Sequence, residues 1–153
     1  MGDANMGAAN AFRQLGAKVG IIVGIIDAAK GALAIVIAQI ANIPQTAVLL
    51  TGVAAVVGHN WPVFLHFRGG RGESTTIGVL LTTITLPMLI IAGPAIAAHF
   101  VFRDTMKAAP FIFVPLPLVC WWLGVSGALI AYSIGLSCLV GFTHFLRTRT
   151  RNA

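Results

Sequence analysis

The chain has 153 residues, of which 58% are hydrophobic and only 9% are charged, and its mean hydropathy is +0.91. An ordinary soluble domain carries roughly 25% charged residues, so this chain has too few polar side chains to cover a water-exposed surface. The formal net charge is +6. Because the cations lie in short stretches between apolar runs and no recognition motif accompanies them, we expect no nucleic acid as a partner. The composition predicts one domain, residues 1–153, with the lipid bilayer as its solvent.

The apolar runs are continuous rather than alternating, which favours membrane helices over barrel strands. In chain order, we expect helices over residues 15–40, 46–64, 74–86, 87–103, 109–123 and 125–147. The predicted fold class is therefore all-α, a polytopic helical membrane protein with about six membrane helices. The helix 74–86 is shorter than the roughly 20 residues of a full crossing.

The basic residues predict the topology, because positive charge favours the cytoplasmic side. They form four groups: Arg13 and Lys18; Arg68 and Arg71; Arg103 and Lys107; and Arg147, Arg149 and Arg151. All four groups reach one side only if the stretch 75–102 is divided near Leu86–Pro87, where proline would end a helix. One long helix over 75–102 is the alternative, and its five crossings would place the basic C-terminal tail outside. We therefore favour six crossings, with the glycine-rich loops at the cytoplasmic face of the inner cell membrane.

The segment 58–75 is basic and rich in glycine, and it is the strongest functional signal in the sequence. Glycines lack a Cβ, so their backbone amides can converge on an anion, as Gly69, Gly70 and Gly72 could here. A helix that starts near Ser74 would direct its N-terminal amides to the same place. Arg68 and Arg71 add positive charge and bidentate donors suited to phosphate. The alternative is a basic loop that only sets topology, but three interleaved glycines exceed that requirement. We predict a phosphate-binding loop.

Several other polar residues are candidates for chemistry. His144, near the end of the last helix, is the best acid–base candidate because histidine titrates near neutral pH, although it could instead be an interfacial residue. His59 is interpreted as a hydrogen-bonding residue that shapes the loop. Asp27 and Lys30 are three residues apart inside the first expected helix, so they can pair, as a structural ion pair or in a direct role. No nucleophile elbow, metal cluster or carboxylate pair is present in the sequence, and we expect no metal and no cofactor.

These motifs, in this order, resemble the bacterial acyl-phosphate:glycerol-3-phosphate acyltransferase (PlsY) family. The family's first loop, Ser-Gly-Asn-x-Gly-Ala-Thr-Asn-x-x-Arg-x-x-Gly, is matched by residues 3–16, which include Asn5, Asn10 and Arg13. Its Asp-x-x-Lys-Gly motif is matched by residues 27–31. Its second loop, Gly-His-x-x-Pro-x-Phe-Leu-x-Phe-Lys-Gly-Gly-Lys-Gly-x-Ala-Thr, is matched by residues 58–75, with arginines at the two lysine positions.

The resemblance implies transfer of an acyl chain from acyl phosphate to the 1-hydroxyl of glycerol 3-phosphate at the membrane lipid surface, without a covalent acyl-enzyme. It implies that residues 68–72 and Thr75 hold substrate phosphate. It also implies catalytic roles for Arg13, His144 and Asn5, with His59, Asn10, Asp27 and Lys30 in support.

The sequence departs from the family pattern at several positions. Asp3 and Ala9 stand where the family has serine and threonine, Glu73 replaces an apolar residue, and Arg147 replaces an asparagine that follows the family's histidine. Family members also usually begin with one more span. Two alternatives therefore stay open: a catalytically impaired relative that binds phosphorylated ligands, and a small membrane transporter. The sequence does not define the oligomeric state.

Overall fold

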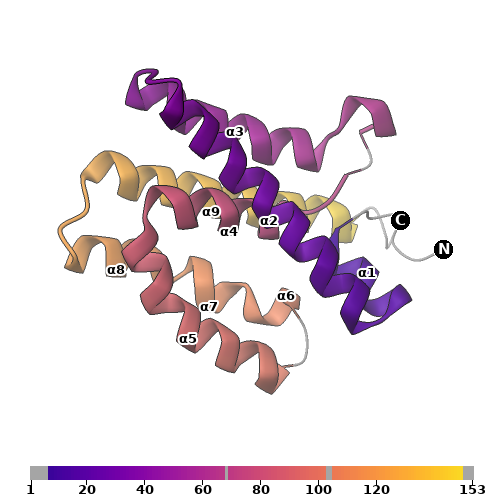
Figure 1. Ribbon diagram of the computed structural model, residues 1–153. Helices are drawn as coiled ribbons and strands as arrows, with labels where there is room; N and C mark the ends of the chain where they lie inside the picture. Colours follow the sequence, from indigo (N-terminus) through magenta and orange to yellow (C-terminus); the bar gives the residue numbers. More distant parts are fainter. Residues whose placement is uncertain (1–6, 68, 103–104, 150–153) are drawn as a thin grey trace.

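The computed structural model describes residues 7–67, 69–102 and 105–149, and within these ranges all regular structure is helical (Figure 1). The elements in chain order are α1 (Ala8–Leu15), α2 (Ala17–Ile40), α3 (Gln45–Asn60), the 3₁₀ helix η1 (Val63–Leu65), α4 (Glu73–Thr83), α5 (Thr85–Phe102), α6 (Thr105–Ala108), α7 (Pro110–Phe113), α8 (Leu116–Trp122) and α9 (Gly127–Arg149). The expected all-α class is confirmed.

Four of the described segments are long and apolar enough to cross a membrane: α2, α3 together with η1, α5 and α9. The continuous apolar stretch Pro110–Trp122 and helix α4 are shorter. Large apolar side chains such as Ile22, Ile25 and Ile37 on α2 are more than half exposed. A helix that exposes such side chains is stable in lipid and not in water, so the chain forms an integral membrane fold.

The expected division of residues 75–102 into two helices is confirmed, but the break lies at Ile84 rather than at Leu86–Pro87. Proline clashes with the carbonyl four residues before it, which for Pro87 is the carbonyl of Thr83. Helix α4 therefore ends at Thr83, and Pro87 lies in the first turn of α5, where proline is tolerated. The hydroxyl of Thr83 donates to the carbonyl of Val79 (3.0 Å), a contact that bends helices.

Other boundaries also differ from the sequence prediction, and three of these differences have an identifiable cause. The first expected helix, 15–40, starts two residues later because Gly16 has a φ of +90°, and a separate helix, α1, precedes it. The second, 46–64, ends at Asn60, since Pro62 has no N–H with which to continue it. The fifth, 109–123, contains Pro115 and Pro117 and is divided into α7 and α8, although Val114 and Pro115 keep helical dihedral angles.

Close packing of α2 against α4 forms the centre of the molecule. A Cβ on Gly78 would meet the carbonyl oxygen of Ala28, and a Cβ on Gly31 would meet that of Thr75. Small residues that let two helix backbones approach are the usual means of packing in membranes, where the hydrophobic effect does not drive helices together. Helix α1 packs along α2, with Phe12 against Gly20.

The two ends of the molecule differ in character (Figure 1). The turns that follow α2 and α8 lie at one end, and neither carries a charge. The segment between α3 and α4 and the last turn of α9 lie at the opposite end. The polar segments that the sequence marks as functional are therefore gathered at one end of the membrane helices.

The α2–α4 contact generates a stability prediction. We expect Gly78→Ala to force the two backbones apart and to cost roughly 1–3 kcal/mol, which lowers the midpoint of thermal unfolding in detergent by about 5–10 °C. Gly135→Ala on α9 is the matched control, because a Cβ there has nothing within 4 Å. Equal unfolding midpoints for the two variants would contradict this account of the packing.

Candidate active site

The segment from the end of α3 to the start of α4 is folded compactly by its own backbone. The amide of Phe67 donates to the carbonyl of Pro62 (3.0 Å), and the amide of Gly70 donates to that of His59 (3.1 Å). His66, Phe67 and Gly72 have positive φ angles. A left-handed conformation is easiest for glycine, and at Gly72 it turns the chain directly into α4.

Three glycines lie against the last turn of α3. A Cβ on Gly69 would meet the carbonyl of His59, a Cβ on Gly70 would meet the His59 ring, and a Cβ on Gly72 would lie 2.5 Å from Oδ1 of Asn60. Any side chain at these positions would displace the loop. The glycines thus allow a close approach of the loop to α3.

Helix α9 holds the loop from the other side. Thr143 Oγ1 donates to the carbonyl of Arg71 (2.9 Å). The guanidinium of Arg147 donates from one nitrogen to the carbonyls of Asn60 (2.8 Å) and Phe67 (3.1 Å). These contacts join residues more than 70 positions apart in the sequence, so they fix the position of the loop relative to the helix bundle.

Arg71 and His144 form the most direct polar pair of the site. Arg71 Nη1 lies 3.1 Å from His144 Nδ1, and Arg71 is only 8% exposed. A guanidinium has no acceptor, so Nδ1 of His144 accepts and the neutral ring carries its proton on Nε2. This contact orients a nearly buried positive charge at the end of the loop, where its field is little screened by water.

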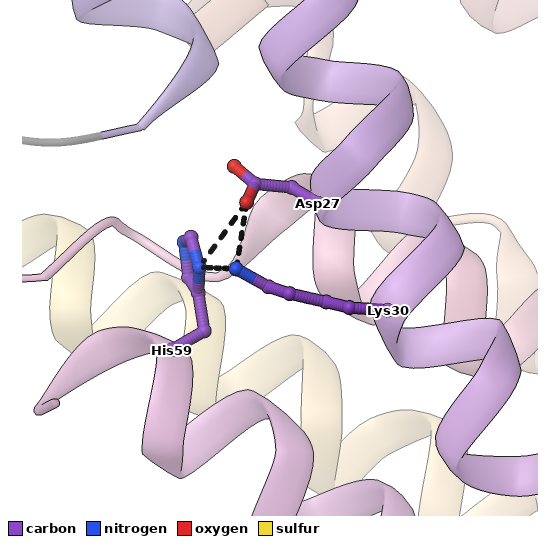
Figure 2. Close-up of polar contacts among 3 residues, drawn as sticks. All are labelled: Asp27, Lys30 and His59. Atoms are coloured by element: carbon purple, nitrogen blue, oxygen red, sulfur yellow. Dashed lines mark hydrogen bonds and ion pairs between the residues drawn. The ribbon is translucent and has the colours of Figure 1, made fainter.

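Asp27, Lys30 and His59 form a second polar cluster beside the loop (Figure 2). Lys30 Nζ lies 2.7 Å from Asp27 Oδ1 and also contacts His59 Nδ1, so the expected pairing of Asp27 with Lys30 is present. The carboxylate offsets the lysine charge, which lowers the cost of placing both charges within the membrane span. One ring nitrogen of His59, Nδ1, faces Lys30, and the other, Nε2, lies against Gly70. The cluster therefore links α2 to the loop through His59.

Among the described residues, two apolar cavities start beside this site, and Glu73 at the start of α4 lines both. One, of about 320 Å³, lies between α7 and α9 and has Arg71 and His144 at its polar end. Its other lining residues are Ala109, Pro110, Phe113, Val114, Ser137, Cys138, Val140 and Gly141. The other, of about 410 Å³, lies between α4, α5 and α7 and includes His99. Only the first joins an apolar surface to the Arg71–His144 pair.

The remaining predicted site residues are placed less centrally. Thr75 is fully buried between α2 and α4, with its methyl group against Gly31. Arg13 is exposed on α1 and lines neither of the two cavities, and Asn10 is partly buried on the same helix. Asn5, Arg68 and Asp3 lie outside the described residues.

Three contributors to the site were not predicted as such. Arg147 was noted only as a departure from an asparagine, whereas Thr143 and Asn60 received no role. Thr143 adjoins His144, but a threonine in an apolar helix usually bonds to its own helix, and this residue does so as well. Asn60 is fully buried, and its side-chain amide has no hydrogen-bond partner in the part of the chain that the structure describes.

Metal chemistry has no evident ligand set in the described ranges, where no group of three or more histidine, cysteine, aspartate or glutamate side chains is suitably arranged. The groups that do lie together, an arginine and a neutral histidine, suit an anion.

Comparison with known proteins agrees with this arrangement. The family model described as glycerol-3-phosphate acyltransferase matches residues 1–150. Glycerol-3-phosphate acyltransferase 4 of Dehalococcoides mccartyi is 48% identical over 149 residues, which cover 97% of this chain and 80% of that protein. Glycerol-3-phosphate acyltransferase 1 of Moorella thermoacetica is 34% identical over 94% of this chain and 73% of its own length.

Solved structures show the same fold. The crystal structure of PlsY (YgiH), an integral membrane glycerol 3-phosphate acyltransferase, in its glycerol 3-phosphate form superposes with a TM-score of 0.82 at 27% identity, over 95% of this chain and 73% of that one. The lysophosphatidic acid form gives a TM-score of 0.80 at 28% identity, over 92% and 72%. The chain belongs to the glycerol-3-phosphate acyltransferase family.

Proposed function

We propose that this membrane acyltransferase moves an acyl chain from acyl phosphate to the 1-hydroxyl of glycerol 3-phosphate. The single observation that carries the proposal is the pairing of the nearly buried Arg71 with His144 at the point where the glycine loop meets an apolar cavity. An acyl phosphate needs both an anion site and an apolar channel. The crystal structures of the family member in its glycerol 3-phosphate and lysophosphatidic acid forms support the acceptor and the product.

The reaction needs no covalent intermediate on the protein. The acceptor hydroxyl oxygen attacks the acyl carbon, the bond from that carbon to the phosphate oxygen breaks, and phosphate leaves with the electron pair. The hydroxyl proton is transferred overall to the released phosphate, so lysophosphatidic acid and inorganic phosphate are the products. The protein accelerates the reaction by positioning the two substrates and by stabilising the anionic oxygens that develop.

Each part of the site has a role in this scheme. Arg68, Arg71 and the backbone of residues 69–72 hold substrate phosphate, and Thr75 lies in the first turn of α4, directly after them. His144 orients Arg71 through Nδ1. The family resemblance implies that three residues of the N-terminal segment act on the substrate: Arg13, Asn5 and Asn10. Ala8, at the start of α1, lies near Gly24 of α2, and Gly24 lies near Ser74 of α4. His59, Asp27 and Lys30 hold the loop in place.

The acyl chain lies, in this proposal, in the cavity between α7 and α9. Its polar end contains Arg71 and His144, and its sides are apolar, so the acyl phosphate group would stop where the phosphate-binding groups begin. Burial of each methylene of the chain contributes about 0.8 kcal/mol.

The location we propose is the inner cell membrane, with the active end facing the cytoplasm. The described basic residues that flank the helices belong to α1, the start of α2, α6 and the last turn of α9, and these segments lie at the end of the molecule that holds the loop (Figure 1). Positive charge favours the cytoplasmic side of a membrane.

A catalytically impaired relative remains the alternative, and turnover separates it from the enzyme. Purified protein in lipid should form lysophosphatidic acid and inorganic phosphate in equal amounts from acyl phosphate and glycerol 3-phosphate. Arg71→Ala should lower kcat/KM by roughly 100-fold, because a buried charged donor to phosphate is removed. Arg71→Lys, which restores the family's usual residue, should retain most activity.

Lys18→Ala, which removes an exposed cation from α2, is the control for charge alone. If the unmodified chain bound glycerol 3-phosphate and yet turned over no faster than Arg71→Ala, that result would identify a catalytically impaired relative and would end the acyltransferase proposal.

The cavity assignment makes a separate prediction about chain length. A side chain at Gly141 would enter the α7–α9 cavity without meeting another atom within 4 Å of its Cβ. Gly141→Leu should therefore lower kcat/KM for a long acyl phosphate by about 10-fold more than for a short one, the equivalent of about two excluded methylenes. Gly135→Leu, on the same helix and outside the cavity, should not. Ala92 lines the other cavity, between α4, α5 and α7. If Ala92→Leu, and not Gly141→Leu, discriminated against long acyl phosphates, the acyl chain would be assigned to that cavity instead.

A further inference from the structure

Arg147 occupies a position where the family usually has asparagine, and its contacts show a different use of that position. One guanidinium nitrogen, Nη2, donates to the carbonyl of Asn60 at 2.8 Å and to that of Phe67 at 3.1 Å. Asn60 ends α3, and Phe67 lies two residues before Gly69. The side chain therefore connects both ends of the segment 60–67 to α9.

Both carbonyls have a physical reason to need such a donor. The carbonyl of Asn60 belongs to the last turn of α3, where carbonyls lack partners within the helix and the helix end carries partial negative charge. Phe67 has a φ of +61°, a left-handed conformation that costs a non-glycine residue roughly 1–2 kcal/mol. A charged donor shared by the two carbonyls stabilises the helix end and the strained turn together.

The same two residues adjoin the phosphate-binding glycines. The Asn60 side chain lies beneath Gly72, and the preceding carbonyl, of His59, accepts from the amide of Gly70. Arg147 also lies one helical turn beyond Thr143, which holds the carbonyl of Arg71. Consecutive turns of α9 thus hold the two halves of the loop.

We propose that Arg147 is a positioning residue that sets the loop for phosphate binding from α9, in place of the family's asparagine. The identity of the substrate in this inference rests on the proposed function, whereas the role of Arg147 in holding the loop does not. An asparagine has a much shorter side chain and could not span the same two carbonyls while α9 stays where it is.

The test combines hydrogen exchange with kinetics on the full chain in detergent–lipid micelles. Arg147→Met keeps the apolar stem and removes the donors. We expect amide exchange in residues 61–70 without substrate to accelerate about 10-fold and KM for glycerol 3-phosphate to rise about 10-fold, as expected for the loss of one charged donor that two carbonyls share. The change in kcat should be smaller. Arg147→Asn should behave in the same way.

Arg149→Met on the same helix is the matched control, because it removes an equal charge from an exposed side chain. The proposed positioning role would be overturned if the amide exchange rate in residues 61–70 were unchanged in Arg147→Met, or if Arg149→Met changed it equally. An Arg147→Asn variant with higher kcat/KM than the unmodified chain would also overturn it, because the position would then be a lost substrate contact. If the unmodified chain shows no turnover, the proposed function fails and the exchange result still decides the role of Arg147.

Discussion

The close contact between the loop glycines and the end of α3 is the constraint on which the site depends. Gly69, Gly70 and Gly72 lie where a Cβ would collide with backbone or buried side-chain atoms of His59 and Asn60. The same absence of side chains brings α2 against α4, so the loop and the helix that follows it are both placed by backbone contact. Such packing is rigid, because a close-packed backbone has no rotamer by which to yield.

Polar contacts then fix what the backbone packing brings together. Helix α9 contributes Thr143, His144 and Arg147, while α2 contributes Asp27 and Lys30 through His59. Arg71 is held nearly buried beside an apolar cavity. In surroundings of low dielectric constant, a fixed positive charge attracts a phosphate more strongly than it would in water, and it requires little rearrangement when the anion arrives.

Much of this arrangement could be predicted from the sequence, and the rest could not for physical reasons. Long apolar runs, Pro87 and the basic clusters predicted the division into helices, because bilayer thickness and proline sterics act locally. The break lay at Ile84 because a proline acts on the carbonyl four residues before it. The role of Arg147 depends on which carbonyls a distant helix presents, and no local pattern encodes that. The glycine loop was recognisable because its chemistry is continuous in sequence, whereas the cavity walls come from separate helices.

The proposed function depends on direct contact between the Arg71 guanidinium and substrate phosphate. The most direct measurement is rotational-echo double-resonance NMR between ¹⁵N-labelled arginine side chains and the ³¹P nucleus of bound glycerol 3-phosphate in lipid. We expect dephasing that corresponds to an N–P separation of about 4 Å, as in a guanidinium–phosphate hydrogen bond. The dephasing should be clearly reduced in Arg71→Lys, where the side-chain nitrogen at this position is unlabelled. Dephasing unchanged by Arg71→Lys, with the ligand still bound, would contradict it.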